Sequence, residues 1–423
     1  MSSEGSSPEA LSGVPARSSV TAGASVAQVA ATVLMGLALA ASPAYLVRPR
    51  AGPLPTTVLE IVLVVALVVG FAVYWRELPW RTPYTWPGLL LLVAATVGVV
   101  VTPNHLHAVA TSREYFIEPA AAGLLCGAIA ARRAHARILL LGLGVAGSIG
   151  GIANMANTLL AIATHHFNWV SPPVILYNTP NAIPLYLEPL LAFSLALVRF
   201  SDDRRERIVA WAFTVIGALS IVLSFSRAGW VTLAVLVVFM AASTRLRWWV
   251  VGAVVVVAGG AFGLSKRVRE RVLVEFQPGP NNTIGSRISL WESTLRMLQH
   301  RPLFGAGLDG FQETVRRYKV PAYGENVVYP HNLFLDFWSE TGLLGLAAIV
   351  WFGIQIVRWS LRGLRALDRP WTQAMSLGML GLALVFVVHG LVDVPYFKND
   401  QSLAFWALAG IQVAALGPAR RAA

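Results

Sequence analysis

The sequence predicts an all-α polytopic membrane protein with about twelve transmembrane helices and one long periplasmic loop that contains short helices. Three observations support this fold class. The 423 residues are 56% hydrophobic and 13% charged, a composition typical of membrane-embedded chains. Apolar runs of about 20 residues recur along the chain, which is the length that crosses a bilayer. Basic residues also gather in alternate connecting segments, as expected for a chain that crosses a membrane repeatedly.

The predicted spans follow one another with short connections, except between the ninth and tenth. The first apolar run is too long for the core of a signal peptide, so we interpret it as an uncleaved first span. The spans are expected at residues 27–47, 57–75, 87–102, 114–130, 137–163, 183–199, 208–225, 228–243, 247–264, 332–357, 372–392 and 402–417. The predicted organisation is a disordered cytoplasmic tail (1–25), nine spans (26–264), a periplasmic loop with amphipathic helices (265–330) and three further spans (331–418).

The distribution of the 33 Lys and Arg residues predicts the orientation. With the N-terminus inside, 18 lie in inner segments, 5 in short outer loops and 10 in the long loop. Because Lys and Arg favour cytoplasmic loops, the bias predicts that both termini are cytoplasmic in the inner membrane. Long segments escape this rule, so the cations of the outer loop point instead to an anion-binding surface.

Composition also narrows the function classes. The one cysteine, Cys126, lies in an apolar run and permits no internal disulfide or cysteine-based metal cluster. No Gly-rich loop with Lys-Ser/Thr is present, so an ATP site of that kind is not predicted. The net charge of +12 in an apolar chain favours an anionic substrate and a lipid surface over nucleic acid.

Arg227 is the strongest candidate binding residue. It lies in Leu-Ser-Phe-Ser-Arg-Ala-Gly-Trp, ending at Trp230, between two apolar runs. An arginine at the hydrocarbon boundary is costly unless it is paired or hydrated, so it indicates function. Its planar fork suits bidentate recognition of phosphate, although an interfacial arginine that reaches toward water remains an alternative.

The long loop contains a predicted amphipathic helix from Gly285 to Leu298. Ile288, Trp291, Leu295 and Leu298 recur at helical spacing and predict an apolar stripe against the membrane bundle. Arg287 is expected in the first turn, where unpaired backbone N–H groups and the helix dipole attract anions. Pro302-Leu-Phe-Gly-Ala-Gly307 is expected to end this helix and turn the chain back.

His331 follows Pro330 at the expected mouth of the tenth span. The imidazole can act as a base, as a hydrogen-bond donor to a leaving oxygen, or as a helix-start residue, and the sequence leaves these roles open. Asp393, at the outer end of the eleventh span, is expected to orient His331 or Arg227.

Further polar residues occur at the mouths of the outer helices. Arg113 adds another cation. Asn178 and Asn181 follow a Pro-rich outer segment and precede Pro189 in the sixth span, and a proline within a span often marks a broken helix that lines a cavity. We predict no metal, since the dyad His165-His166 has no further ligand at suitable spacing. Three outward cations and one histidine on apolar helices indicate a substrate with a charged head and an apolar tail, such as a lipid diphosphate.

Four motifs resemble the O-antigen ligase and polymerase superfamily of bacterial membrane glycan transferases. They are Ser-Arg-Ala-Gly-Trp at 226–230, Ser286-Arg287 followed by Trp291, Pro-Leu-Phe-Gly-Ala-Gly-Leu at 302–308 and Pro-His-Asn-Leu-Phe-Leu at 330–335. The resemblance implies glycan transfer from undecaprenyl diphosphate on the periplasmic side, without metal, ATP or another cofactor. It further implies that Arg227 and Arg287 hold the diphosphate and that His331 activates the acceptor hydroxyl or positions the donor.

Within this superfamily we expect the ligase that transfers O-antigen to lipid A–core oligosaccharide, because the outer loop is modest and no long C-terminal periplasmic domain follows the last span. An O-antigen polymerase or a protein O-oligosaccharyltransferase with the same donor is the alternative. A lipid-linked glycan transporter is the alternative from another class. The clustering of the cations on one side argues against a path through the membrane.

Overall fold

The computed structural model describes residues 24–48, 56–168, 171–242, 244–273, 283–320 and 328–417, and every regular element among them is helical. The predicted tail, residues 1–25, lies outside the described residues except for its last two. Ser25 begins the described fold as the N-cap of the first helix, in a capping box with Gln28.

The helices of the first half of the chain are α1 (Val26–Ala40), η1 (Ser42–Leu46), α2 (Val58–Tyr74), η2 (Trp75–Glu77), α3 (Thr85–Val101), α4 (His105–Ser112), η3 (Arg113–Ile117), α5 (Glu118–Ile129), α6 (Arg133–Ala163) and α7 (Ala182–Phe200). Those of the second half are α8 (Arg204–Leu223), α9 (Arg227–Ala241), α10 (Arg247–Leu264), α11 (Lys266–Leu273), α12 (Thr283–His300), α13 (Phe311–Val315), η5 (Arg316–Tyr318), α14 (Leu333–Leu364), α15 (Pro370–Val388), η6 (His389–Leu391) and α16 (Asn399–Leu416).

Seven helices among the described residues are long and apolar enough to cross a membrane. They begin at Val58, Arg133, Ala182, Arg204, Arg247, Leu333 and Pro370. Helices α1, α3 and α9 are apolar but shorter. Every predicted apolar run overlaps a helix, which supports a multi-pass membrane protein, whereas the count of twelve spans and the limits of the loop and tail stay predictions.

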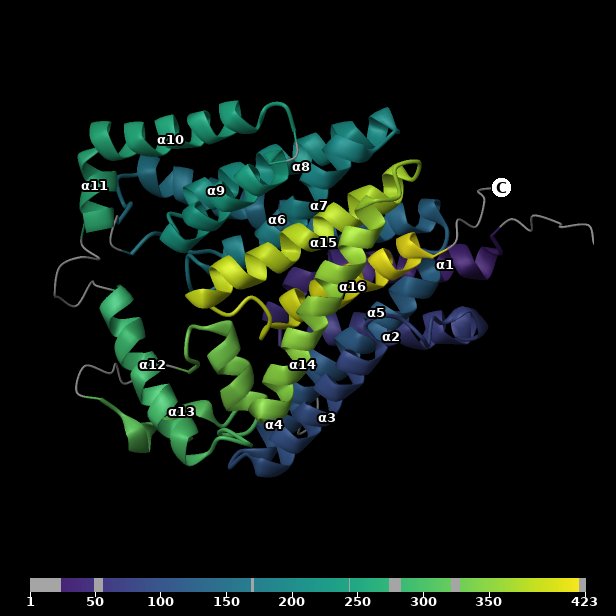
Figure 1. The fold of residues 1–423 in the computed structure, drawn as a ribbon, viewed down its shortest axis with the longest axis horizontal. Helices are drawn as coiled ribbons and strands as arrows, with labels where there is room; N and C mark the ends of the chain where they lie inside the picture. The colour runs from purple at the N-terminus through teal and green to yellow at the C-terminus, as the bar shows by residue number, and fades with distance from the viewer. Residues whose placement is uncertain are drawn as a thin grey trace, which may run out of the picture.

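The core is built around helices from the end of the chain. Helix α16 packs on α5, and α15 packs on α7 and α14. Figure 1 shows α15 and α16 crossing the middle of the molecule, α10 along one edge beside α9, and α12 and α13 grouped together at one end of the bundle. Helix α16 is buried along most of its length, whereas no residue of α10 is buried, so α10 is peripheral. Such exposed apolar helices fit a lipid surrounding.

Helix α14 breaks at Gly342, which has φ +70°. The sequence predicted a continuous span over 332–357, and the structure corrects this to a longer element with a sharp break. The chain after α12 docks into the break, because Leu343 donates its backbone N–H to the Leu303 carbonyl (3.0 Å) and Ala306 donates to the Ser339 carbonyl (2.7 Å). A Cβ at Gly342 would lie 2.4 Å from the Leu303 oxygen, so only glycine fits. The predicted turn at 302–307 therefore fixes the first part of α14.

Helix α12 confirms the predicted helix but differs from it in two details. It already includes Thr283, so Arg287 lies in its second turn and not in the first as expected. The buried face carries Leu290, Met297 and Leu298, whereas Ile288 and Leu295 of the predicted stripe are about half exposed. The predicted stripe is thus confirmed at Leu298, which is buried, and wrong at Ile288 and Leu295. Helical spacing also fits the neighbouring face, where Ser293 and Thr294 are buried with the apolar residues.

Candidate functional site

Two helix starts with the same local design carry the strongest candidates. Ser226 caps α9 by accepting the N–H of Gly229 (3.0 Å), which makes Arg227 the first residue of that helix. Asn332 caps α14 by accepting the N–H groups of Phe334 and Leu335 (both 3.1 Å), directly after His331. The helix thus begins at Leu333, next to residue 332 where the predicted span starts.

The residue before each cap has a left-handed backbone. Phe225 has φ +55° and His331 has φ +49°. Non-glycine residues rarely adopt this conformation, which costs about 1–3 kcal/mol and gathers at functional sites. The contacts that hold His331 in it include the ring of Tyr329, whose centroid lies 4.5 Å from that of the imidazole.

Asp393 joins the candidate residues into one group. His331 Nδ1 lies 3.3 Å from Asp393 Oδ1, and the Arg287 guanidinium lies 3.8 Å from Oδ2. Asn181 donates its side-chain amide to Oδ2 at 2.8 Å. The Asp393 carboxylate is 3% exposed, whereas His331 is 29% exposed, so a buried acid holds an accessible imidazole.

Arg227 is connected to this group through two neighbours. Ser226 donates its hydroxyl to the Asn181 side-chain oxygen at 2.7 Å. Arg227 itself donates to the Thr283 hydroxyl at 3.2 Å, and Thr283 lies four residues before Arg287 on α12. Residues four apart share one face of a helix, so Arg227 reaches the face that carries Arg287. Asp393, His331, Arg287, Asn181, Ser226 and Arg227 are called the Asp393 cluster below.

The electrostatics of the cluster centre on Asp393. Burial raises the pKa of this carboxyl, but the hydrogen bond from His331 and the charges of His331, His389 and Arg287 outweigh it and hold the pKa well below its ordinary value. Asp393 therefore stays ionised at neutral pH. The cluster contains one carboxylate and two arginines, so it retains positive charge for an anion.

A buried pair supports the turn that carries Asp393. His389 Nδ1 lies 2.7 Å from Glu188 Oε2, and neither side chain is exposed. The His389 carbonyl accepts the backbone N–H groups of Val392 (3.0 Å) and Asp393 (2.9 Å). This pair fixes the end of α15 and with it the position of the carboxylate.

Two other candidates from the sequence, Arg113 and Asn178, are not members of the Asp393 cluster. Arg113 forms ion pairs with Glu60 (2.8 Å), Glu118 (3.2 Å) and Glu114 (3.8 Å) between α2, η3 and α5. Asn178 is exposed in the segment before α7. Carboxylates thus surround Arg113, and its predicted role in substrate binding stays untested.

Ser226 and Thr283 are site residues that the sequence reading missed. A serine directly before Arg227 is a helix-cap signal that was available in the sequence. Thr283 has no such signal, because its contact with Arg227 joins residues that are 56 positions apart in the sequence. The expectation that Asp393 orients His331 matches the observed contact, whereas its arginine partner is Arg287 rather than Arg227.

This arrangement has the parts needed for group transfer from an anionic donor. Two guanidinium groups provide planar forks for phosphate oxygens. An imidazole held by a carboxylate through one nitrogen presents the other to an acceptor.

Comparison with known proteins gives a family match for part of the chain. Residues 212–350 match the protein family described as O-antigen ligase. Arg227, Arg287 and His331 all lie within the matched residues, whereas Asn181 and Asp393 lie outside them.

A curated protein of Haemophilus influenzae, described as uncharacterized, is 22% identical over 237 residues, which cover 51% of this chain and 57% of that relative. The match therefore spans little more than half of the relative's length. The family match covers the residues of the four motifs and confirms the resemblance drawn from them.

Proposed function

We propose that this protein is an O-antigen ligase that transfers a glycan from undecaprenyl diphosphate to lipid A–core oligosaccharide on the periplasmic side of the inner membrane. The observation that carries the proposal is the Asp393 cluster. It joins an accessible histidine, a buried carboxylate and two arginines from helices far apart in the sequence. We further propose that the loop from residue 265 to 330 lies in the periplasm.

In this proposal Arg227 and Arg287 bind the diphosphate of the donor. Arg227 is the first residue of α9, so the partial positive charge of the helix start adds to its own. Charge builds up on the diphosphate as it leaves, and two fixed guanidinium groups stabilise it there. These cations stabilise the leaving diphosphate as a divalent metal does in other transferases. The proposed reaction therefore needs neither metal nor ATP.

His331 acts on the acceptor. Its Nδ1–H is donated to Asp393, which leaves the lone pair on Nε2 for the proton of the acceptor hydroxyl. The acceptor oxygen bonds to the anomeric carbon of the donor sugar, the bond from that carbon to the diphosphate breaks, and the proton moves to Nε2. Asp393 stabilises the imidazolium that forms, and Asn181 and Arg287 hold Asp393 in place. For Arg113 and Asn178 the substrate contact stays a prediction from the sequence.

The test is a reconstituted reaction in proteoliposomes with an undecaprenyl-diphosphate-linked glycan and purified lipid A–core. Glycan on lipid A–core, formed equally well in EDTA, is the expected result. Longer lipid-linked glycan with unmodified core would show a polymerase instead. Donor that crosses the bilayer without reacting would show a transporter, and activity that EDTA abolishes and a divalent ion restores would refute the metal-free reaction.

A further inference from the structure

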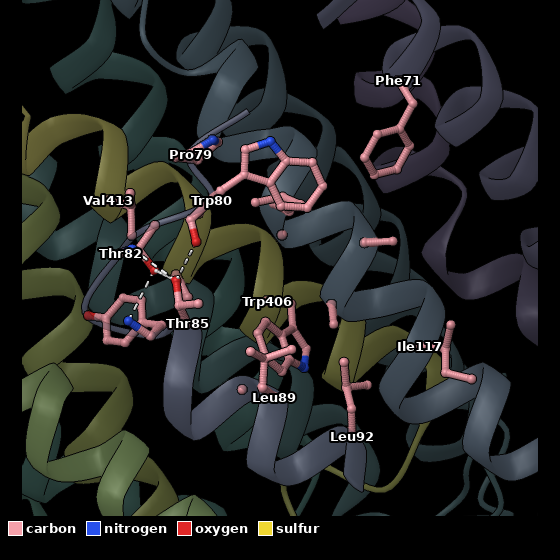
Figure 2. Close-up of a pocket in the computed structure, with 18 residues that line it drawn as sticks. Phe71, Pro79, Trp80, Thr82, Thr85, Leu89, Leu92, Ile117, Trp406 and Val413 are labelled. Atoms are coloured by element: carbon pink, nitrogen blue, oxygen red, sulfur yellow. Dashed lines mark hydrogen bonds between the residues drawn. The ribbon is translucent and has the colours of Figure 1, made fainter. Parts of the chain in front are cut away.

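A second site candidate is an apolar groove of about 380 Å³ between α2, α3, α5 and α16. This volume lies in the range of small-molecule sites, about 300–1,000 Å³. Leu89 and Ile117 on its walls are 47% and 54% exposed, so the groove opens sideways from the helices. Figure 2 shows Trp406, Leu89 and Leu92 along it, with Trp80, Thr82 and Thr85 together at one end.

The polar groups at one end of the groove form hydrogen bonds within the protein. Thr85 donates its hydroxyl to the Trp80 carbonyl (3.0 Å), the Thr82 backbone N–H donates to the Thr85 hydroxyl (2.9 Å), and the two hydroxyls lie 3.1 Å apart. The Tyr84 hydroxyl donates to the side chain of Gln412. The rest of the lining is almost entirely apolar, so the groove suits an alkyl chain rather than a sugar or a phosphate.

The groove and the Asp393 cluster share no residue. Thr85 lines the groove at the first residue of α3, whereas Gly98 near the other end of α3 accepts the N–H of Leu308 from the chain after α12. A rise of 1.5 Å per residue separates these two positions by about 20 Å. The end of the groove at Thr85 therefore lies about 20 Å along α3 from the chain that docks into the break of α14.

The connection between α2 and α3 carries the features of a membrane–water interface. Trp75 and Trp80 are 60% and 52% exposed, and their ring centroids lie 5.5 Å apart. Tryptophan is enriched where the headgroups begin. Arg76 and Arg81 are exposed in the same connection, and Arg81 stands between the groove residues Trp80 and Thr82. Cations beside an apolar groove at this depth match an anionic headgroup with its acyl chain inside.

We propose that this groove binds one acyl chain of an anionic phospholipid, with the headgroup phosphate at Arg81. The proposal does not depend on the glycan-transfer reaction. The bound lipid fills the space between four helices that otherwise leave apolar walls open, and so holds α3 against α5 and α16. Charge complementarity selects an anionic headgroup over a zwitterionic one.

The test is native mass spectrometry of the full-length protein in detergent with equal amounts of phosphatidylglycerol and phosphatidylethanolamine. The wild-type protein is expected to retain one phosphatidylglycerol molecule in preference to phosphatidylethanolamine. Ala120→Phe fills the groove from α5 and Leu89→Trp fills it from α3, so each should abolish retention. Arg81→Gln should weaken it about fivefold, the effect of one charge near the surface. Val255→Phe and Arg245→Gln, at exposed positions of α10 and the connection before it, are matched controls without effect.

A phosphatidylglycerol with a photoreactive group in its acyl chain should cross-link to groove residues in wild type. Equal retention by wild type, Ala120→Phe and Leu89→Trp would overturn the site. Preferential capture of undecaprenyl phosphate over phosphatidylglycerol would overturn the choice of lipid, and retention indifferent to the headgroup would overturn the role of Arg81.

Discussion

Asp393 is the residue through which the candidate site is assembled. One of its oxygens faces His331 and the other faces Asn181 and Arg287, so a single buried carboxylate fixes side chains from α7, α12 and the start of α14. Removing one partner of such a buried group costs more than an exposed contact contributes, because the remaining charge is left uncompensated. The residues of this group should therefore be sensitive even to conservative changes.

Arg227→Lys should lose most of the transfer activity. Lysine keeps the charge but presents a single ammonium, which cannot copy the planar fork of arginine on two phosphate oxygens. The measurement is the initial rate of transfer beside Arg245→Lys, a control at an exposed arginine. Near-normal turnover of the Arg227 variant would show that only net charge matters.

Asp393→Asn should lower stability by about 1–3 kcal/mol, since it removes the charge that His331 and Arg287 face. The pKa of Asp393 is below its ordinary value, so its charge stabilises the fold above about pH 4, and this contribution is lost as the pH falls through the lowered pKa.

The measurement is the thermal midpoint of wild type and variant as a function of pH. The difference should stay constant from pH 8 to pH 5 and narrow below about pH 4. Asp368→Asn, at an exposed aspartate, should show no difference across this range. A gap for Asp393→Asn that narrows already above pH 5 would contradict the assigned charge state.

Among the elements, α14 and the chain that docks into its break position His331. Trp338 donates its indole N–H to the Pro302 carbonyl (2.7 Å), and Trp291 of α12 donates to the Pro330 carbonyl (3.0 Å). The chain on both sides of His331 is thus tied to α12 and to the segment that follows α12. The break at Gly342 allows this docking, which a continuous helix would exclude.

Gly342→Ala should destabilise the protein by about 1–3 kcal/mol and reduce activity, because the new Cβ meets the Leu303 oxygen and φ is +70°. Gly353→Ala is the matched control. It lies in the same helix with nothing within 4 Å of its Cβ position, and it should be neutral or stabilise slightly. The measurements are the unfolding midpoints and transfer rates of both variants. Equal midpoints and equal rates would refute the role of the break in positioning His331.

At the scale of the whole molecule, the candidate site includes Arg287 of α12, a helix that lies with α13 at one end of the bundle (Figure 1). The positive-inside count predicts that this end faces the periplasm and that the connection between α9 and α10 faces the cytoplasm.

Cysteine labelling tests this orientation. In a Cys126→Ser background, Arg296→Cys on α12 should react with a membrane-impermeant maleimide in right-side-out spheroplasts. Arg245→Cys should react only after permeabilisation. Both positions are exposed, so access to the reagent decides the outcome. The reverse pattern would invert the topology.

Sequence patterns predicted the helical class, because apolar runs of bilayer length are a strong signal. They also selected Arg227, Arg287 and His331 as candidates, because these residues lie in polar segments between the apolar runs. They did not predict the break at Gly342 or the buried face of α12. Both depend on contacts with segments that are distant in the sequence. The Leu303 carbonyl accepts a hydrogen bond from α14, and the Ser293 hydroxyl of α12 accepts one from the Val320 backbone. The spacing of residues along one helix does not predict such contacts.

The central claim is that the Asp393 cluster performs glycan transfer, and the most direct measurement compares His331→Ala with wild type in the reconstituted reaction. His300→Ala, at an exposed histidine of α12, is the matched control. We predict glycan on lipid A–core with wild type and His300→Ala, and at least about a hundredfold less with His331→Ala, as expected for the loss of a general base. A rate for His331→Ala close to that of wild type, with folded protein and intact donor, would contradict the claim.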